Sequence, residues 1–137
     1  MKIQPDQLPG TNVLTRHGPG ELWVGNTQFR QSLLVPWQGT VLPWRPNVPD
    51  DLTEADFEAV LALKPELVIF GSGTRLRFVS PALIRCLIDR RIGVETMDTG
   101  AACRTYNVLA TEGRSVVAAL LMQPEMPTLA PASNTAG

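Results

Sequence analysis

The chain has 137 residues, with 12 basic and 13 acidic side chains and a formal net charge of -1. This length suits one domain with a single core, and the even charge balance excludes a general attraction to nucleic acid or to an anionic membrane surface. No apolar run reaches the roughly 20 residues of a membrane-spanning helix, and the first ten residues lack the pattern of a secretory or transit signal. We therefore expect a soluble, cytoplasmic protein whose binding depends on a local site.

Short extended segments separated by turn residues make up the first part of the chain. Gly, Pro and Asn residues bound these segments, which are predicted to form strands over residues 12–17, 21–24 and 27–35. Such strands joined by tight turns predict an antiparallel meander. The prolines of residues 36–49 predict an edge strand or an irregular wrap, because proline cannot donate to a central ladder. Trp37 and Trp44 in this segment are predicted to close the core rather than to bind a ligand.

Helices and strands alternate in the second part of the chain. Thr53 and Asp56 have capping-box spacing and predict a helix that Pro65 ends. A second helix begins at Pro81 and ends at Gly93. Its apolar stripe consists of Leu83, Ile84, Leu87 and Ile88, opposite a polar face. Further elements are a third helix over residues 100–111, which stops near a glycine at 113, and strands over residues 67–70, 94–97 and 114–121.

Two successive strand-helix-strand units imply parallel strands joined by crossovers. We therefore predict a single-domain α/β fold, with an N-terminal antiparallel meander followed by two β-α-β crossovers. Open sheets of this kind bind ligands at the carboxyl ends of their strands. The loops at residues 71–73 and 98–100 both follow predicted strands, so we expect them to face one crevice.

Several kinds of chemistry are disfavoured by the residues present. Two cysteines and one distant histidine do not make a zinc site, and no P-loop, nucleophile elbow or Ser-His-Asp set is present. We predict no metal and no cofactor. His17 is expected to be an exposed turn residue, and Cys86 a core residue. Cys103 either packs, which we favour, or is activated as a thiolate at a helix start.

The predicted crevice holds two groups of candidates whose roles stay open. The residues Gly71, Ser72 and Gly73 form a tight strand exit or a phosphate cradle, although Leu76 stands where a dinucleotide fingerprint has its third glycine. Arg104 and Asn107 share a helix face. Both could bind a ligand. Alternatively, Arg104 forms an ion pair within the protein, and Asn107 forms a hydrogen bond to the backbone of a neighbouring loop. The predicted cleft comprises Gly71, Ser72, Gly73, Asp98, Thr99, Arg104 and Asn107.

The chain resembles a known family through two linked stretches, LVIFGSGTRLRF and IGVETMDTGAACRTYNVLATEGRSVVAALL. This family includes the mitochondrial respiratory complex I assembly factor 3 and the adipogenesis-associated Mth-domain protein, with many bacterial members of unknown function. The resemblance covers residues 12–121 and implies a three-layer β/β/α fold with a mixed sheet and a cleft at the candidate residues. Ser72 stands where other members often carry Thr, which keeps the hydroxyl. The lack of a mitochondrial presequence fits a bacterial member.

Two functions of different classes follow from the residues and the resemblance. The first is a binding or assembly module, linked to a respiratory or other membrane complex through a protein partner, with no nucleic acid and no membrane insertion. The alternative is an enzyme or a small-anion binder that uses the crevice between the loops at residues 71–73 and 98–100. The absence of a P-loop, a nucleophile elbow and a Ser-His-Asp set favours the binding or assembly module. We expect a domain over residues 12–121, between a flexible stretch over 1–11 and a disordered, proline-rich tail over 122–137.

Overall fold

The computed structural model describes residues 10–123 and begins with a three-stranded antiparallel sheet. Its strands, in spatial order, are β1 (Leu14–Gly18), β2 (Glu21–Val24) and β3 (Thr27–Phe29). The predicted meander is thus confirmed. The prediction of one strand over residues 27–35 is wrong, because residues 30–32 interrupt it and the following strand, β4 (Leu33–Pro36), belongs to another sheet.

A five-stranded mixed sheet forms the centre of the molecule. In addition to β4 it contains β5 (Leu42–Pro43), β6 (Leu67–Gly71), β7 (Gly93–Met97) and β8 (Val116–Leu120). The spatial order is β5-β4-β8-β6-β7, with β6 parallel to both β7 and β8, and β4 antiparallel to β8 and β5. The two parallel crossovers are confirmed, and the proline-rich segment supplies a short edge strand, as predicted.

Three α-helices connect these strands: α1 (Glu54–Leu61), α2 (Arg85–Ile88) and α3 (Thr99–Thr111). A single 3-10 turn, η1 (Pro49–Asp51), precedes them. The capping box predicted from Thr53 and Asp56 is present at α1. The second helix is shorter than its apolar stripe predicts, because residues 81–84 form turns.

The end of α2 also differs from the prediction. Arg91 adopts a positive φ of 60°, and the Ile92 amide donates to the Leu87 carbonyl at 3.0 Å, which is the backbone pattern that closes many helices. Gly93 is not the stop residue but the first residue of β7. At α3, by contrast, Gly113 does take the stop position, with a φ of 84°.

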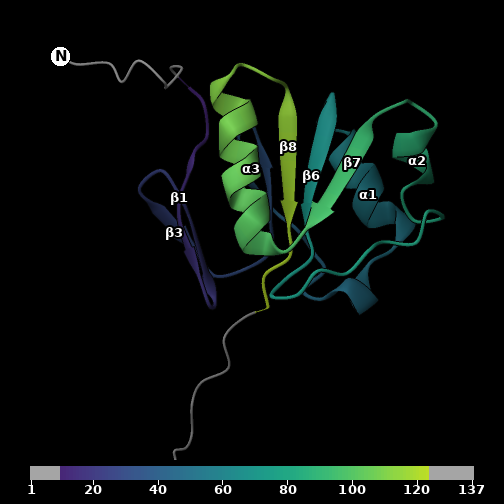
Figure 1. Ribbon diagram of the computed structural model, residues 1–137, viewed down its shortest axis with the longest axis horizontal. Helices are drawn as coiled ribbons and strands as arrows, with labels where there is room; N and C mark the ends of the chain where they lie inside the picture. Colours follow the sequence, from purple (N-terminus) through teal and green to yellow (C-terminus); the bar gives the residue numbers. More distant parts are fainter. Residues whose placement is uncertain (1–9, 124–137) are drawn as a thin grey trace, which may run out of the picture.

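The central sheet is covered on both faces (Figure 1). The N-terminal sheet and α3 cover one face, and α1 and α2 cover the other. Along β8, Val116, Ala118 and Leu120 pack toward α3, while Val117 and Ala119 pack toward α1 and α2. A strand buried on both faces reads as a continuous apolar run. The fold is therefore α/β with a mixed sheet, as the sequence predicts.

Aromatic side chains close the core under α1. The Trp44 and Phe57 rings pack edge to face with centroids 5.7 Å apart, and Phe70 lies 6.2 Å from Trp44. The indole N–H of Trp44 donates to the Asp56 carbonyl at 3.1 Å, so its one polar group is satisfied inside the core. Trp37 packs against the opposite core cluster and is half-buried. Both tryptophans thus serve the core, as predicted.

Two side chains of α3 hold the N-terminal segment against the helix. The buried Tyr106 hydroxyl lies 2.9 Å from the Asn12 carbonyl and 3.1 Å from the Pro36 carbonyl. Asn107 accepts a hydrogen bond from the Leu14 amide at 2.8 Å and donates to the Leu14 carbonyl at 2.7 Å. The paired bonds continue the backbone pattern of β1 onto a side chain, and they set the position of the N-terminal sheet.

Each predicted terminal segment overlaps the described part of the chain by two residues, 10–11 and 122–123. Thr11 forms a bridge with Gln38, and buried Met122 accepts and donates hydrogen bonds with the Ser32 hydroxyl. The rest of the flexible stretch and of the tail predicted from the sequence, residues 1–9 and 124–137, lies outside the described residues. None of the helices within residues 10–123 combines the length and the apolar character needed to cross a membrane.

Candidate functional site

The carboxyl ends of β6, β7 and β8 lie at one end of the molecule, the lower end in Figure 1. The loops that leave β6 and β7 are bonded directly to each other there. The Ser72 amide donates to the Met97 carbonyl at 2.9 Å, and the Thr99 amide donates to the Gly73 carbonyl at 2.8 Å. The two loops were predicted to face one crevice, and residues of both line the cavity described below. They are also joined to each other, because each satisfies backbone groups of the other.

Thr99 links all three parallel strands. Its hydroxyl accepts from the Gly73 amide and donates to the Leu121 carbonyl, both at 2.9 Å. Gly71 allows this close approach, since a Cβ there would lie only 3.0 Å from the Thr99 Cα and from Leu120. Gly73 has a φ of 107°, a conformation that favours glycine. The geometry therefore gives both glycines a structural reason.

Ser72 and Asp98 also brace the backbone. The buried Ser72 hydroxyl donates to the Arg75 carbonyl at 2.6 Å and accepts from the Arg77 amide at 2.9 Å. The Asp98 carboxylate caps α3 by accepting from the Ala101 amide at 2.9 Å. These hydrogen bonds engage the Ser72 hydroxyl and one Asp98 carboxylate oxygen, and they fix the shape of the site.

A cavity of about 620 Å³ lies beside the joined loops. One wall comes from the loops themselves, and another from β1, the turn after it and the segment that contains η1. Its lining consists of His17, Gly18, Pro19, Gly20, Asn47, Val48, Pro49, Asp50, Ser72, Gly73, Thr74, Arg75, Arg77, Asp98, Thr99, Gly100, Leu121, Met122 and Gln123. The lining combines apolar residues with charged ones, which is the usual composition of a ligand pocket.

His17 is one of the lining residues that the sequence did not place in the predicted cleft. Its imidazole packs against the first turn of α3, where a Cβ on Gly100 would lie 3.1 Å from the His17 Cε1. The sequence predicts an exposed turn residue, and His17 is indeed exposed. Its neighbours on β1 give no local signal of this contact, because the contact arises only when β1 docks on α3.

Arg104 and Asn107 do not join the cavity. The Asn107 side chain is hydrogen-bonded to the Leu14 backbone, which is the structural role that the sequence offered as the alternative to ligand binding. Arg104 is exposed on α3, and within residues 10–123 it makes no hydrogen bond or ion pair. The helical spacing correctly places both on one side of α3. That side faces the N-terminal sheet and solvent, not the strand ends that supply the cavity.

The cysteines behave as packing residues. Cys103 is buried in the core between α3 and the sheet, and burial raises the pKa of its thiol to about 12, against the opposing effect of the Arg104 charge. It is therefore a neutral thiol near neutral pH. Cys86 is half-buried beside the cluster under α2. No group of three or more His, Cys, Asp or Glu side chains suited to a metal ion occurs among residues 10–123.

Comparison with known proteins gives one family and several relatives. The family model described as a protein of unknown function (DUF498/DUF598) matches residues 14–121. The NADH dehydrogenase [ubiquinone] 1 alpha subcomplex assembly factor 3 of Mus musculus is 36% identical over 108 residues, which cover 77% of this chain and 57% of that protein. The chain thus spans little more than half the length of this curated relative.

Solved structures show the same architecture in bacterial proteins. A crystal structure from Bordetella parapertussis has a TM-score of 0.79 at 36% identity and covers 83% of this chain and 98% of its own. A Bordetella pertussis protein described as a Mth938-like domain has a TM-score of 0.78 at 30% identity. The match covers 91% of this chain and 94% of that protein. The family match extends through every strand and helix of the described fold. The chain belongs to the DUF498/DUF598 family of proteins of unknown function.

Proposed function

We propose that this protein is a cytoplasmic binding module that assists the assembly of a membrane-bound respiratory complex by holding a protein partner. Relatives named as assembly factors for NADH dehydrogenase support the biological setting. The setting is a proposal for this chain, because it spans about half of those proteins. Direct insertion into the membrane and binding of nucleic acid form no part of the proposed role.

One observation supports a binding module rather than an enzyme. The hydroxyls of Ser72 and Thr99 and one oxygen of the Asp98 carboxylate, the groups that a catalytic mechanism would use, are hydrogen-bonded to backbone groups of the loop after β6, of the first turn of α3 and of Leu121. A nucleophile needs a neighbouring base that is free to take its proton. Groups that brace a cavity make a rigid receptor, which supports recognition rather than reaction.

A second candidate is a protein that binds a small anion in the same cavity. The Arg75 and His17 side chains at the lining favour it, since both can donate hydrogen bonds to an oxyanion. Titration with phosphate, followed by the nuclear magnetic resonance signals of these two residues, checks this candidate. Saturable shifts at both residues would support it, and unchanged signals would contradict it.

The assembly role is tested in native cells that lack the protein. The amount of intact respiratory complex, measured on native gels, should fall, and a smaller subassembly should accumulate because one joining step is slowed. Expression of the wild-type chain should restore the intact complex. A normal amount of complex without the protein would contradict the proposed function.

A further inference from the structure

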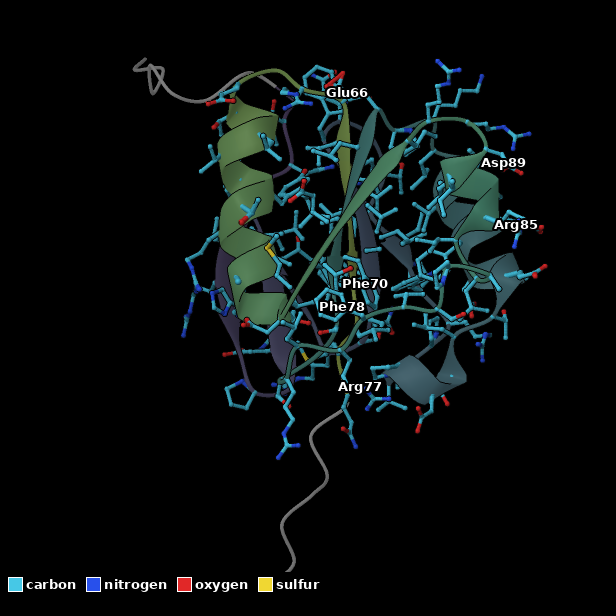
Figure 2. All side chains as sticks on the ribbon, turned by 45° about the vertical axis from the view of Figure 1, so that its right-hand side comes forward. Glu66, Phe70, Arg77, Phe78, Arg85 and Asp89 are labelled. Carbon is cyan, nitrogen blue, oxygen red and sulfur yellow. The ribbon has the colours of Figure 1, made fainter. Side chains whose placement is uncertain are left out.

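The loop after β6 exposes two large apolar side chains. Phe78 is 78% exposed and Leu76 is 52% exposed. They alternate with arginines, since the sequence of residues 74–79 is TRLRFV. Figure 2 shows Phe78 and Arg77 on the part of the molecule where the loop passes the ends of the strands. Apolar groups gathered on an exposed segment are a usual feature of interaction sites.

This loop is held in place rather than left free. The buried Ser72 hydroxyl binds the Arg75 carbonyl and the Arg77 amide, and the Arg77 guanidinium pairs with Asp50 of η1 at 3.0 Å. The ion pair is exposed and adds little by itself, but the buried serine fixes the backbone between the two arginines. The backbone that carries Leu76 and leads into Phe78 is thus held in place, which lowers the entropy cost of binding a partner.

The charged residues of the loop line the cavity, and its exposed apolar residues lie outside the cavity. Arg75 and Arg77 belong to the lining of the 620 Å³ cavity, whereas Leu76 and Phe78 do not. A ligand that extends from the cavity across the loop would therefore meet cationic groups first and apolar groups next. Guanidinium groups bind carboxylates through paired hydrogen bonds, and exposed aromatic side chains act as anchors in protein interfaces.

Charges of both signs line the cavity beside this loop, namely Arg75, Arg77, Asp50 and Asp98. Asp50 pairs with Arg77, and Asp98 caps α3, whereas the Arg75 guanidinium makes no ion pair within residues 10–123. The loop of residues 74–79 itself carries these two arginines and no acidic residue. An unpaired cation on such a loop favours a partner that carries negative charge.

We propose that the loop of residues 74–79 and the adjoining cavity bind an acidic peptide segment of a protein partner, with Phe78 and Leu76 contacting its apolar side chains. The cavity favours a peptide over a lipid surface, because carboxylate side chains can enter a concave site and the headgroups of a flat bilayer cannot. This inference rests on the proposed role as a binding module, and it specifies the partner's chemistry.

Selection from a phage-displayed library of random 16-residue peptides tests the proposal. Sequences retained by the wild-type chain should contain more Asp and Glu than the starting library, together with bulky apolar residues. A synthetic peptide of the most enriched sequence should bind about tenfold more weakly to Phe78→Ser and to Arg75→Ser, as expected for the loss of an anchor. Fluorescence anisotropy measures these affinities.

Matched variants on α3 separate a specific site from a general effect. Val108→Ser removes another exposed apolar side chain, which is 57% exposed, and Arg104→Ser removes another exposed arginine. Both should bind the peptide like the wild type. Because Phe78 is exposed, Phe78→Ser should retain the wild-type melting temperature, which excludes unfolding as the cause of lost binding.

Three results of these binding experiments would overturn the inference. The first is an enrichment of neutral or basic peptides, or none at all. The second is undiminished binding by Phe78→Ser. The third is Phe78-dependent sedimentation with phosphatidylglycerol vesicles in place of peptide binding, which would identify a membrane as the occupant. In cells, full restoration of the respiratory complex by Phe78→Ser would contradict this inference while leaving the proposed assembly role intact.

Discussion

Asp56 shows how one carboxylate serves both a helix and a distant segment. Its oxygens accept hydrogen bonds from the Thr53 amide at 2.8 Å, from the Thr53 hydroxyl at 3.0 Å and from the Arg45 guanidinium at 2.7 and 3.0 Å. Burial alone would raise the pKa of Asp56. The hydrogen bonds from Arg45 and Thr53 together outweigh burial and hold this pKa below its usual value.

Replacement of Asp56 by Asn should therefore lower the free energy of unfolding by about 0.5–2 kcal/mol at pH 7, the range typical of lost N-terminal helix caps. A depressed pKa stabilises the folded state above the unfolded pKa of 3.8 and loses this effect as pH falls through the lower, folded value. The difference between variant and wild type should accordingly shrink in acid. Urea unfolding at pH 7 and pH 3 measures it.

Asp50→Asn is the matched control, because Asp50 forms an exposed ion pair with Arg77. It should change the free energy of unfolding by less than about 0.5 kcal/mol. Equal losses in the two variants would contradict the assignment of Asp56 as the capping carboxylate that stabilises α1.

Cys103 yields a prediction about reactivity and alkaline pH. In a Cys86→Ser background, the Cys103 thiol should resist a disulfide reagent at pH 8 and react fully in urea, because it is buried with a raised pKa. Between about pH 9 and 12 the unfolded thiol ionises and the folded one does not, so stability should decline over that window. Rapid labelling of the folded protein would contradict the structural role.

Asn107 carries a prediction at the scale of elements, because it joins α3 to β1. Asn107→Ala leaves the amide and the carbonyl of Leu14 without their side-chain partner, and each unsatisfied, partly buried group costs about 1–3 kcal/mol. We expect a loss of at least about 2 kcal/mol in the free energy of unfolding, measured by urea denaturation.

Arg104→Ala is its control on the same helix face. Arg104 is exposed and makes no bond within residues 10–123, so stability should remain within about 0.5 kcal/mol of the wild type. A large loss in this variant would show that Arg104 has a structural role that the fold does not account for.

Local sequence signals predicted the elements whose ends depend on nearby residues. The capping box of Thr53 and the stop at Gly113 act within one helical turn, and both appear as expected. The length of α2 was overestimated, because its apolar stripe can be buried by turns as well as by a helix. At the cavity, the spacing of Arg104 and Asn107 predicted their common face but not what that face meets, since this depends on the docking of β1.

At the scale of the whole molecule, the point at which the chain passes from one sheet to the other could not be predicted from the sequence. Residues 27–35 read as one strand because Phe29, Leu33 and Leu34 are all apolar and β-forming. Phe29 packs on the core cluster around α3, and Leu33 and Leu34 lie in the central sheet. A change of sheet within one extended run requires long-range pairing, here of β4 with β8, which no local pattern specifies.

The two sheets should differ in local stability. All five residues of β8 are buried, whereas most residues of β1 and β3 are exposed. Amides of β8 should exchange with solvent only through global unfolding, and those of β1 to β3 at least about tenfold faster through local opening. Hydrogen exchange followed by nuclear magnetic resonance measures this, and equal protection of both sheets would contradict it.

The place of β8 in the sheet also determines when the protein can fold during synthesis. β8 is the last strand of the described chain, yet it lies between β4 and β6 and pairs with both. Until the ribosome has released it, the nascent chain holds two unconnected half-sheets, β4 with β5 and β6 with β7. The inner edges of both halves then stay open to other chains, so completion of this fold has to wait until β8 has left the ribosome.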